Sequence, residues 1–182
     1  MLFYRYVFHL EELNPAEGIV YSALISQSLM SNPEFFNLEG KFQTEAVRDY
    51  LSDNNEFIDC PEINISKLAK QVEMARNSTK KCVDSLKLKG FLVANCYLKL
   101  PLQVFNAGYY NIPANTGLSG QQLVFYGFIH DQASHFGGST GTWTSKLAKD
   151  TNISEHNAHC IISILHKKGL VERLPNGRLK VL

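Results

Sequence analysis

The stretch SKLAKQVEMARNSTKKCVDSLKLKG, Ser66 to Gly90, returns in modified form as SKLAKDTNISEHNAHCIISILHKKG, Ser145 to Gly169. The two 25-residue stretches align without a gap at a constant offset of 79 positions (145 − 66). Both begin with Ser-Lys-Leu-Ala-Lys and both end with Lys-Gly. A repeat of this length and regularity indicates that one structural unit occurs twice in the chain.

Apolar and small residues recur along the second half of each stretch with the spacing i, i+3, i+4, i+7. They are Thr79, Cys82, Val83 and Leu86 in the first copy and Ala158, Ile161, Ile162 and Leu165 in the second. This spacing marks one face of an α-helix. A shorter amphipathic segment precedes each helix, and a four-residue break around Glu73 or Asn152 separates the two segments. Each copy is therefore predicted to fold as helix, tight turn, helix.

Each copy ends at a glycine, Gly90 or Gly169, preceded by lysines, as is typical of a helix C-terminus. A run of residues that favour β-strands follows each glycine. In the second copy, Pro175-Asn176-Gly177 is a turn signal between two such runs and predicts a β-hairpin. The first copy has no comparable Asn-Gly turn, so its hairpin is expected somewhere within residues 91–105.

Two helices and a hairpin in this order resemble the core of winged-helix DNA-binding proteins. The short strand-like segment Tyr109–Pro113, with Tyr4–Phe8 as its counterpart, is similar to the strand that enters the first helix in replication-initiator-type winged helices of plasmids and phages. The resemblance implies a mainly α fold with small β-wings (α+β). It also implies two winged helix-turn-helix domains in tandem, over residues 1–107 and 108–182.

The first domain is expected to carry an insertion. Asn14–Glu17 and Ser119–Gln122 both have the pattern of a helix start with a capping box. These starts are 105 positions apart (119 − 14), whereas the repeats are 79 apart, so the first domain holds 26 extra residues (105 − 79). They lie within residues 30–62 and include a helical pattern at 43–51. A decorating helix with a solvated loop and an acidic surface for a protein partner are both open interpretations.

The formal net charge of +1 conceals a segregation of charge along the chain. Residues 1–61 contain three Lys/Arg and ten Asp/Glu, a net charge of −7. Residues 62–93 contain seven and three, and residues 94–182 contain eight and four, a net charge of +4 in each case. Positive charge therefore gathers on the repeated stretches, where a surface that contacts phosphate would need it.

The candidate DNA contacts are the polar positions of the second helix and the hairpin in each copy. They are Arg76, Asn77, Ser78, Lys80, Lys81 and Lys87 in the first copy, and His156, Asn157, His159, Arg173, Arg178 and Lys180 in the second. Arginine can bind guanine and asparagine can bind adenine, whereas lysine neutralises phosphate. A solvated basic face is the alternative for the first copy. Because Glu155 would repel phosphate, backbone contact and dimerisation compete with base reading in the second.

Other classes of function leave no signature in the sequence. There is no phosphate-binding glycine loop, Gly-x-Ser-x-Gly or His-Glu-x-x-His motif, so neither an enzyme nor a cofactor is expected. His156, His159 and Cys160 lie close together, but no paired ligand spacing accompanies them, so no metal is expected. No apolar run is long enough for a membrane span. Four well-separated cysteines indicate reduced thiols and a cytoplasmic protein.

Two functions remain open at this stage. The resemblance implies binding of double-stranded DNA by a transcriptional regulator or a mobile-element replication initiator, with the tandem copies acting as a dimer within one chain. Alternatively, winged helices serve as protein-interaction scaffolds that do not read DNA. A homodimer of the whole chain is also left open.

Overall fold

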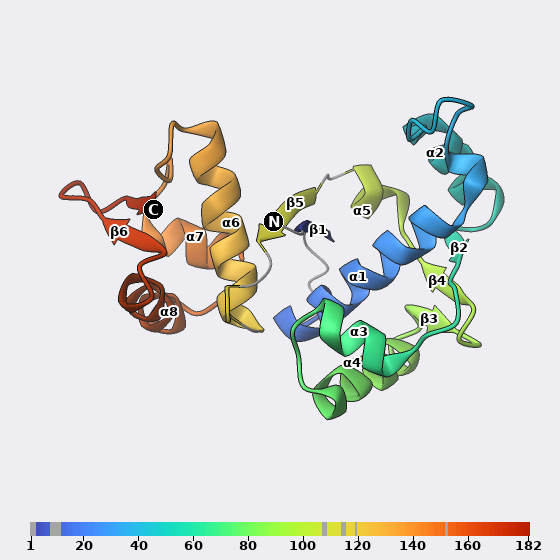
Figure 1. Ribbon diagram of the computed structural model, residues 1–182, viewed down its shortest axis with the longest axis horizontal. Coiled ribbons are helices and arrows are strands. Elements are labelled where there is room, and N and C mark those ends of the chain that lie inside the picture. The colour runs from blue at the N-terminus through green and yellow to red at the C-terminus, as the bar shows by residue number, and fades with distance from the viewer. Residues whose placement is uncertain (1–2, 8–11, 107–108, 114–115, 119, 152) are drawn as a thin grey trace. The chain divides into compact units, whose positions relative to one another are not determined.

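The computed structural model describes residues 3–7, 12–106, 109–113, 116–118, 120–151 and 153–182 (Figure 1). The fold is α+β: helices predominate, and the strands form small antiparallel sheets. The chain divides into two compact units. The first unit comprises Arg5–Tyr109, and the second comprises Tyr110–Leu182 together with residues 1–4.

The first unit contains a long helix, a decorated connection, two further helices and a small sheet. Its elements from Pro15 onward are α1 (Pro15–Ser31), the short 3₁₀ helix η1 (Pro33–Phe35), α2 (Thr44–Asp53), β2 (Phe57–Asp59), α3 (Ile65–Gln71), α4 (Arg76–Leu88), β3 (Leu92–Val93), β4 (Tyr97–Lys99) and α5 (Leu102–Asn106). The predicted succession of helix, turn and helix in the first repeat is confirmed as α3 and α4.

The helix α1 starts with the predicted capping box. The Glu17 backbone N–H donates to Asn14 Oδ1 at 3.0 Å, and the Asn14 backbone N–H donates to Glu17 Oε2 at 2.8 Å. These bonds satisfy two backbone donors that a helix start would otherwise leave unpaired. Every residue from Glu17 to Ile25 is buried, so α1 is the central helix of its unit.

The core of the first unit forms where α1 packs against α3, α4 and the small sheet. The predicted apolar face of α4 is confirmed, because Thr79, Cys82, Val83 and Leu86 are all buried. Tyr21 of α1 lies in the middle of this core, with its ring 5.3 Å edge-on from Phe91 and its hydroxyl donating to the Lys99 carbonyl. One face of α4 is thus fixed in the core, and its opposite face is available for contacts outside the unit.

The sheet of the first unit has the strand order β2-β4-β3, and both pairs are antiparallel. The hairpin β3–β4 lies within the predicted range. Its turn uses Ala94 and Asn95, both with positive φ, 50° and 59°. Two successive left-handed residues are what a tight hairpin turn requires, although glycine usually supplies one of them. The third strand, β2, comes from the end of the predicted insertion.

The insertion is a packed part of the first unit. Val47 and Leu51 of α2 and Phe35 of η1 are fully buried. The Phe35 ring lies 5.3 Å edge-on from that of Tyr50. The predicted helical pattern at 43–51 is confirmed by α2, which turns its apolar side to the unit and its acidic side to solvent.

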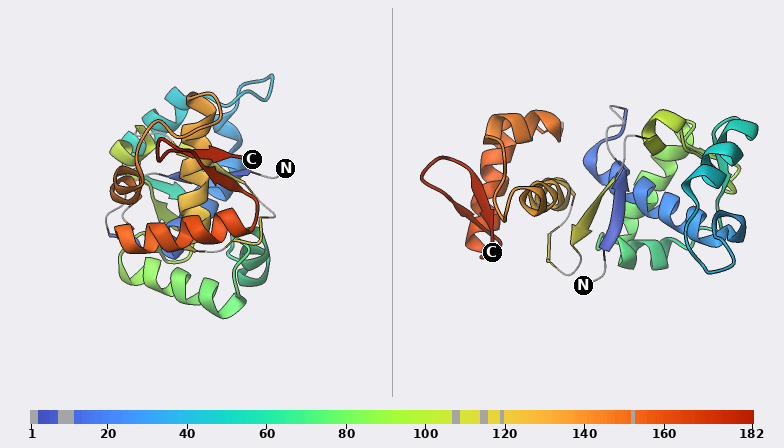
Figure 2. Two further views of the ribbon diagram at one scale, coloured as in Figure 1. Left: turned by 90° about the vertical axis from the view of Figure 1, so that its left-hand side faces the viewer. Right: turned by 90° about the horizontal axis from the view of Figure 1, so that it is seen from above.

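The second unit repeats this arrangement without the insertion. Its elements are α6 (Gln121–His135), α7 (Thr144–Asp150), α8 (Glu155–Lys167), β6 (Val171–Arg173) and β7 (Leu179–Val181). The apolar face of α8, formed by Ala158, Ile161, Ile162 and Leu165, is buried as predicted. The hairpin β6–β7 turns at Gly177, with φ 79°, and its loop extends away from α7 and α8 (Figure 2).

The sequence predicted a strand before the first helix of each unit and a capping box at the start of the first helix of the second unit. The strand-like segments are present as β1 (Phe3–Val7) and β5 (Tyr109–Pro113), which form a two-stranded sheet. The helix α6 begins at Gln121, and its N-cap position is Gly120, which offers no capping side chain. Ser119, the expected cap, lies outside the described residues. Among the described residues, no helix is long and apolar enough to cross a membrane.

Candidate nucleic-acid interface

The turn between α3 and α4 sets the position of the first candidate helix. Glu73 adopts a positive φ of 53°, and the Met74 N–H donates to the Ala69 carbonyl at 3.0 Å. The N-cap of α4 is Ala75, which has no side-chain hydrogen bond to the helix start. In α8 the equivalent Ser154 accepts from the Asn157 N–H at 3.3 Å. The first turn of α4 therefore lacks the capping bond that α8 has.

The other end of α4 is held on the start of α1 by a buried carboxylate. Glu17 accepts from Ser85 Oγ at 2.6 Å and from Lys89 Nζ at 2.7 Å. Burial would raise the pKa of Glu17, but these two hydrogen bonds, the Asn14 backbone N–H and the charge of Lys89 together hold it below its ordinary value. Lys89 thus uses its charge inside the unit rather than on a partner.

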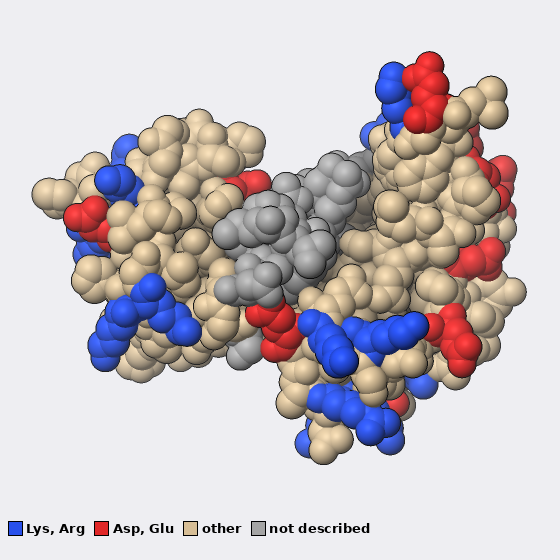
Figure 3. Space-filling model, viewed as in Figure 1, with Lys and Arg blue, Asp and Glu red and all other residues tan. Residues whose placement is uncertain are grey.

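The six candidate residues of α4 lie on its solvent side. We call Arg76, Asn77, Ser78, Lys80, Lys81 and Lys87 the first basic face; all six are exposed. Among the described residues, no acid pairs with Arg76, Lys80 or Lys81, whereas Lys87 Nζ lies 4.0 Å from Asp84 Oδ1. Figure 3 shows the lysine and arginine side chains gathered over α3 and α4. Arg76, Lys80 and Lys81 therefore offer positive charge that no acid of the described part of the chain pairs with.

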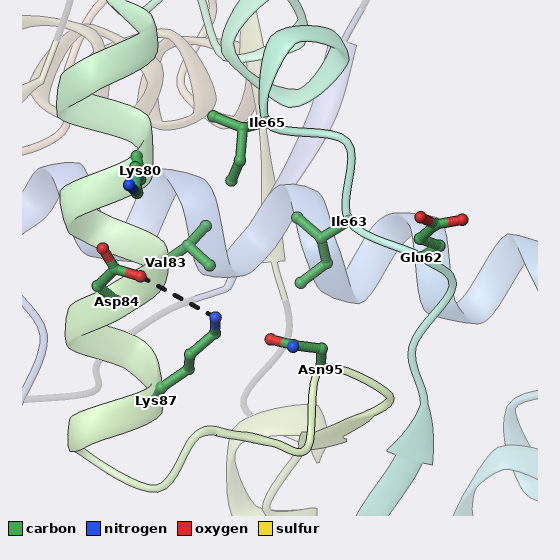
Figure 4. A pocket seen from close by; sticks show the side chains of 8 residues that line it. All are labelled: Glu62, Ile63, Ile65, Lys80, Val83, Asp84, Lys87 and Asn95. Carbon is green, nitrogen blue, oxygen red and sulfur yellow. Dashed lines mark ion pairs between the residues drawn. The ribbon is translucent and has the colours of Figure 1, made fainter.

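A pocket of about 280 Å³ opens beside the first basic face (Figure 4). It lies between α4, the segment leading into α3 and the turn of the hairpin β3–β4. Its lining residues are Glu62, Ile63, Ile65, Lys80, Val83, Asp84, Lys87 and Asn95. Two of the candidate residues thus border a hollow that has an apolar floor and a hairpin residue at its edge.

The candidate residues of α8 are exposed, but the protein itself engages part of their polar surface. His159 Nε2 lies 3.8 Å from Glu155 Oε1, and its Nδ1 lies 3.4 Å from Arg173 Nη2. His156 Nε2 lies 3.9 Å from Cys160 Sγ. The structure thus brings α8 and the first hairpin strand together at His159, with an acid in the same cluster. Positive charge here is weaker than on α4.

The hairpin of the second unit carries the remaining candidates, Arg178 and Lys180, both exposed. Lys180 stands opposite Glu172 in the strand pairing, so part of its charge is offset. Arg178 follows Gly177, where the ring of Trp143 lies against the turn: a Cβ at Gly177 would come within 2.9 Å of it. Trp143 remains 60% exposed. The turn of this hairpin therefore has an exposed aromatic ring against its glycine and an exposed cation at the next position.

Two residues at these surfaces were not predicted as contacts. Asn95 was missed because its turn lacks an Asn-Gly signal, and only the strand pairing places it in the same pocket as Lys80 and Lys87. The contact of Trp143 with the hairpin turn depends on tertiary folding, so no local sequence pattern predicts it. Among the described residues, no three His, Cys, Asp or Glu side chains are grouped as metal ligands.

Comparison with known proteins does not identify a family for this chain. No protein-family model matches the chain, and no curated protein matches it in sequence. A solved structure that matches is the mRNA-binding domain of elongation factor SelB from E. coli in complex with SECIS RNA. The match covers 76% of this chain and 97% of that chain, at 14% identity and a TM-score of 0.28. This score is too low to establish a shared fold, so the function proposed below rests on the residues of this chain alone.

Proposed function

We propose that the two units are winged-helix domains and that the chain binds double-stranded DNA, chiefly through the first basic face. The observation that carries this proposal is the exposed row of Arg76, Lys80 and Lys81 on α4, which has no acid partner among the described residues. The opposite side of the same helix is buried in the core. The helix is therefore fixed by one side while the other offers cations to an anionic partner.

The dimensions of a helix suit this role. An α-helix with its side chains is about 10–12 Å across, and the DNA major groove is about 12 Å wide. Arg76 and Asn77 occupy the first turn of α4, the part of such a helix that faces base edges when it enters the groove. Lys80, Lys81 and Lys87 follow at positions suited to phosphate. A transcriptional regulator or a replication initiator would use such a helix in the same way.

The proposal is tested by the salt dependence of affinity for duplex DNA. If five phosphates are neutralised, the slope of log affinity against log salt is about −4.5. Replacing Lys80 and Lys81 with Ala removes two of these contacts and makes the slope shallower by about 2. Lys41→Ala with Arg48→Ala removes the same charge from the insertion and should leave the slope unchanged. Equal effects of the two double variants would contradict a dedicated binding face.

The second candidate function is a protein-interaction scaffold. The observation that favours it is the acidic surface of the insertion, where Glu34, Asp49 and Asp53 are all exposed. A basic or mixed-charge protein partner would fit this surface. A flat salt slope on duplex DNA, together with retained binding of a protein partner by the Lys80/Lys81 variant, would favour the scaffold.

A further inference from the structure

Two cysteines of the first unit stand opposite each other at the end of its sheet. The strands β2 and β4 are paired in the register Phe57↔Lys99, Ile58↔Leu98 and Asp59↔Tyr97, so the next positions are Cys60 and Cys96. The Cys60 N–H donates to the Cys96 carbonyl at 2.7 Å, which shows that the pairing continues to this point. In a regular antiparallel sheet, opposite residues that exchange both such bonds have Cα atoms about 5.5 Å apart. Here one of the two bonds is present, because the Cys96 N–H donates to the Val93 carbonyl at 3.1 Å and closes the hairpin turn.

The two cysteines also belong to the same side of the sheet. Cys60 follows Ile58 by two positions, and Cys96 precedes Leu98 by two. Ile58 and Leu98 are partners, and both are buried. Cys60 and Cys96 lie one position beyond the ends of β2 and β4, and the alternation of side chains along each strand, continued by one position, would carry them on this side as well. Disulfides form between residues whose Cα atoms are about 4.4–6.8 Å apart, a range that includes the spacing of directly opposite residues in a regular sheet.

The environments of the two thiols differ. Both are free cysteines; Cys60 is buried, with 6% of its surface exposed, and Cys96 is exposed. Burial raises the pKa of the Cys60 thiol, and the Cys60 Sγ donates to the Pro61 carbonyl at 3.6 Å. An oxidant from solvent therefore meets Cys96 first. Because Cys60 is buried, we expect it to react only with a mixed disulfide that has already formed on Cys96.

We propose that Cys60 and Cys96 form an oxidisable thiol pair that reacts with low-molecular-weight disulfides to give an intramolecular disulfide. The Cys96 thiolate attacks one sulfur of glutathione disulfide and releases one glutathione thiolate, leaving a mixed disulfide on Cys96. The Cys60 thiolate then attacks the Cys96 sulfur, forms the Cys60–Cys96 bond and releases the second glutathione thiolate. The two protons of the protein thiols pass to the two glutathiones, so the protein is oxidised by two electrons and one glutathione disulfide is reduced.

The bond would join two walls of the pocket beside the first basic face. Asn95 immediately precedes Cys96, while Glu62 and Ile63 follow Cys60 closely, and all three line this pocket. Oxidation would therefore fix the hairpin turn against the segment that leads into α3. This inference stands on strand register and burial, so it does not depend on the proposed binding of DNA.

The remaining cysteines are natural controls. Cys82 is buried in α4, and Cys160 is exposed on α8 of the second unit. Among the described residues, neither is cross-strand to another cysteine. Cys160 therefore measures the reaction of an exposed thiol that has no neighbour to resolve the adduct.

The test is peptide mapping by mass spectrometry after the reduced, full-length protein is incubated with glutathione disulfide. In the wild type we expect a Cys60–Cys96 disulfide and little glutathione on Cys96, whereas Cys160 retains its adduct. In Cys60→Ser the adduct on Cys96 should persist, because the resolving thiol is gone. In Cys96→Ser, Cys60 should stay reduced. Cys82→Ser should behave as the wild type.

Two outcomes would overturn the inference. One is a wild type that keeps glutathione on Cys96 to the same extent as Cys60→Ser. The other is pairing of Cys96 with Cys160 in preference to Cys60. Since Cys60 is buried, its variant could unfold; Cys96→Ser changes an exposed position and supplies the comparison in a folded protein. In the oxidised wild type, amide hydrogen exchange of residues 94–97 should be slower than in the reduced protein.

Discussion

At the scale of single residues, the contact between Trp143 and Gly177 restricts which residue the hairpin of the second unit can have at position 177. Gly177 has φ 79°, and a Cβ there would come within 2.9 Å of the Trp143 ring. Substitution would therefore introduce two separate costs, one in the backbone and one against the ring. Gly137, in the same unit, has φ 68° with nothing within 4 Å of its added Cβ. The two glycines together separate these costs.

We expect Gly137→Ala to lower the free energy of unfolding by about 1 kcal/mol, the cost of a left-handed alanine. Gly177→Ala should lower it by about 2–3 kcal/mol, because the ring must also move. Thermal unfolding followed by circular dichroism measures both. Equal losses in the two variants would show that the ring contact is unimportant.

In the turn of the first hairpin, by contrast, a substitution to glycine is expected to raise the stability of the protein. Ala94 has φ 50°, a conformation that costs alanine energy but costs glycine little. We expect Ala94→Gly to raise the free energy of unfolding by about 0.5–1 kcal/mol. Asn95→Gly should give a smaller gain, since asparagine tolerates the left-handed region. Urea denaturation measures the difference, and a loss of stability in Ala94→Gly would contradict this account of the turn.

At the scale of secondary-structure elements, the link between α1 and α4 predicts a dependence of stability on pH. The pKa of Glu17 is held below its ordinary value of 4.5 in the folded chain. The stability that the carboxylate contributes is fully present above the unfolded pKa, and it is lost as the pH falls through the folded pKa. The first unit should therefore lose stability as the pH is lowered below about 5.

The variant Glu17→Gln isolates this effect. It should be less stable than the wild type at pH 7, and the difference should shrink as the pH falls, since the wild-type carboxyl is then also uncharged. Denaturation curves at several values of pH measure it. Glu39→Gln is the control, because Glu39 forms only an exposed pair with Lys41. A constant difference between Glu17→Gln and the wild type would show that the carboxylate charge does not link the helices.

The elements also show what a sequence can and cannot predict. The buried faces of α4 and α8 were predicted because a helix records its own burial in the spacing of apolar residues. The capping role of Glu17 was predicted because it depends on four neighbouring residues. Its bonds to Ser85 and Lys89 join residues far apart in the chain, and no local pattern encodes them.

The same contrast applies to the hairpins and the candidate interface. The hairpin turn at Gly177 was predicted from its Asn-Gly pair, whereas a turn through Ala94 is imposed by the pairing of its strands. Exposure of the first basic face followed from helical periodicity. The place of Asn95 in the pocket beside α4 could not be predicted in this way, because only the fold brings this residue near α4.

At the scale of the whole molecule, the repeated unit predicts how much DNA the chain covers. If both units enter the major groove on one side of the duplex, their sites should be centred about one helical turn, roughly 34 Å, apart. Footprinting on duplexes selected from a random pool measures this spacing. Protection no wider than a single unit requires would show that only the first unit binds. The weaker charge on α8 makes this a demanding test of the second unit.

The position of Trp143 has a practical consequence for such measurements. It is the only tryptophan in the chain, and it lies exposed beside the hairpin of the second unit. Excitation at the red edge of protein absorption therefore gives emission from this unit alone, without any attached dye. A ligand that quenches or shifts the Trp143 emission must bind to the second unit or change its conformation. If a ligand binds by another assay but leaves the emission unchanged, the first unit is where it is expected to bind.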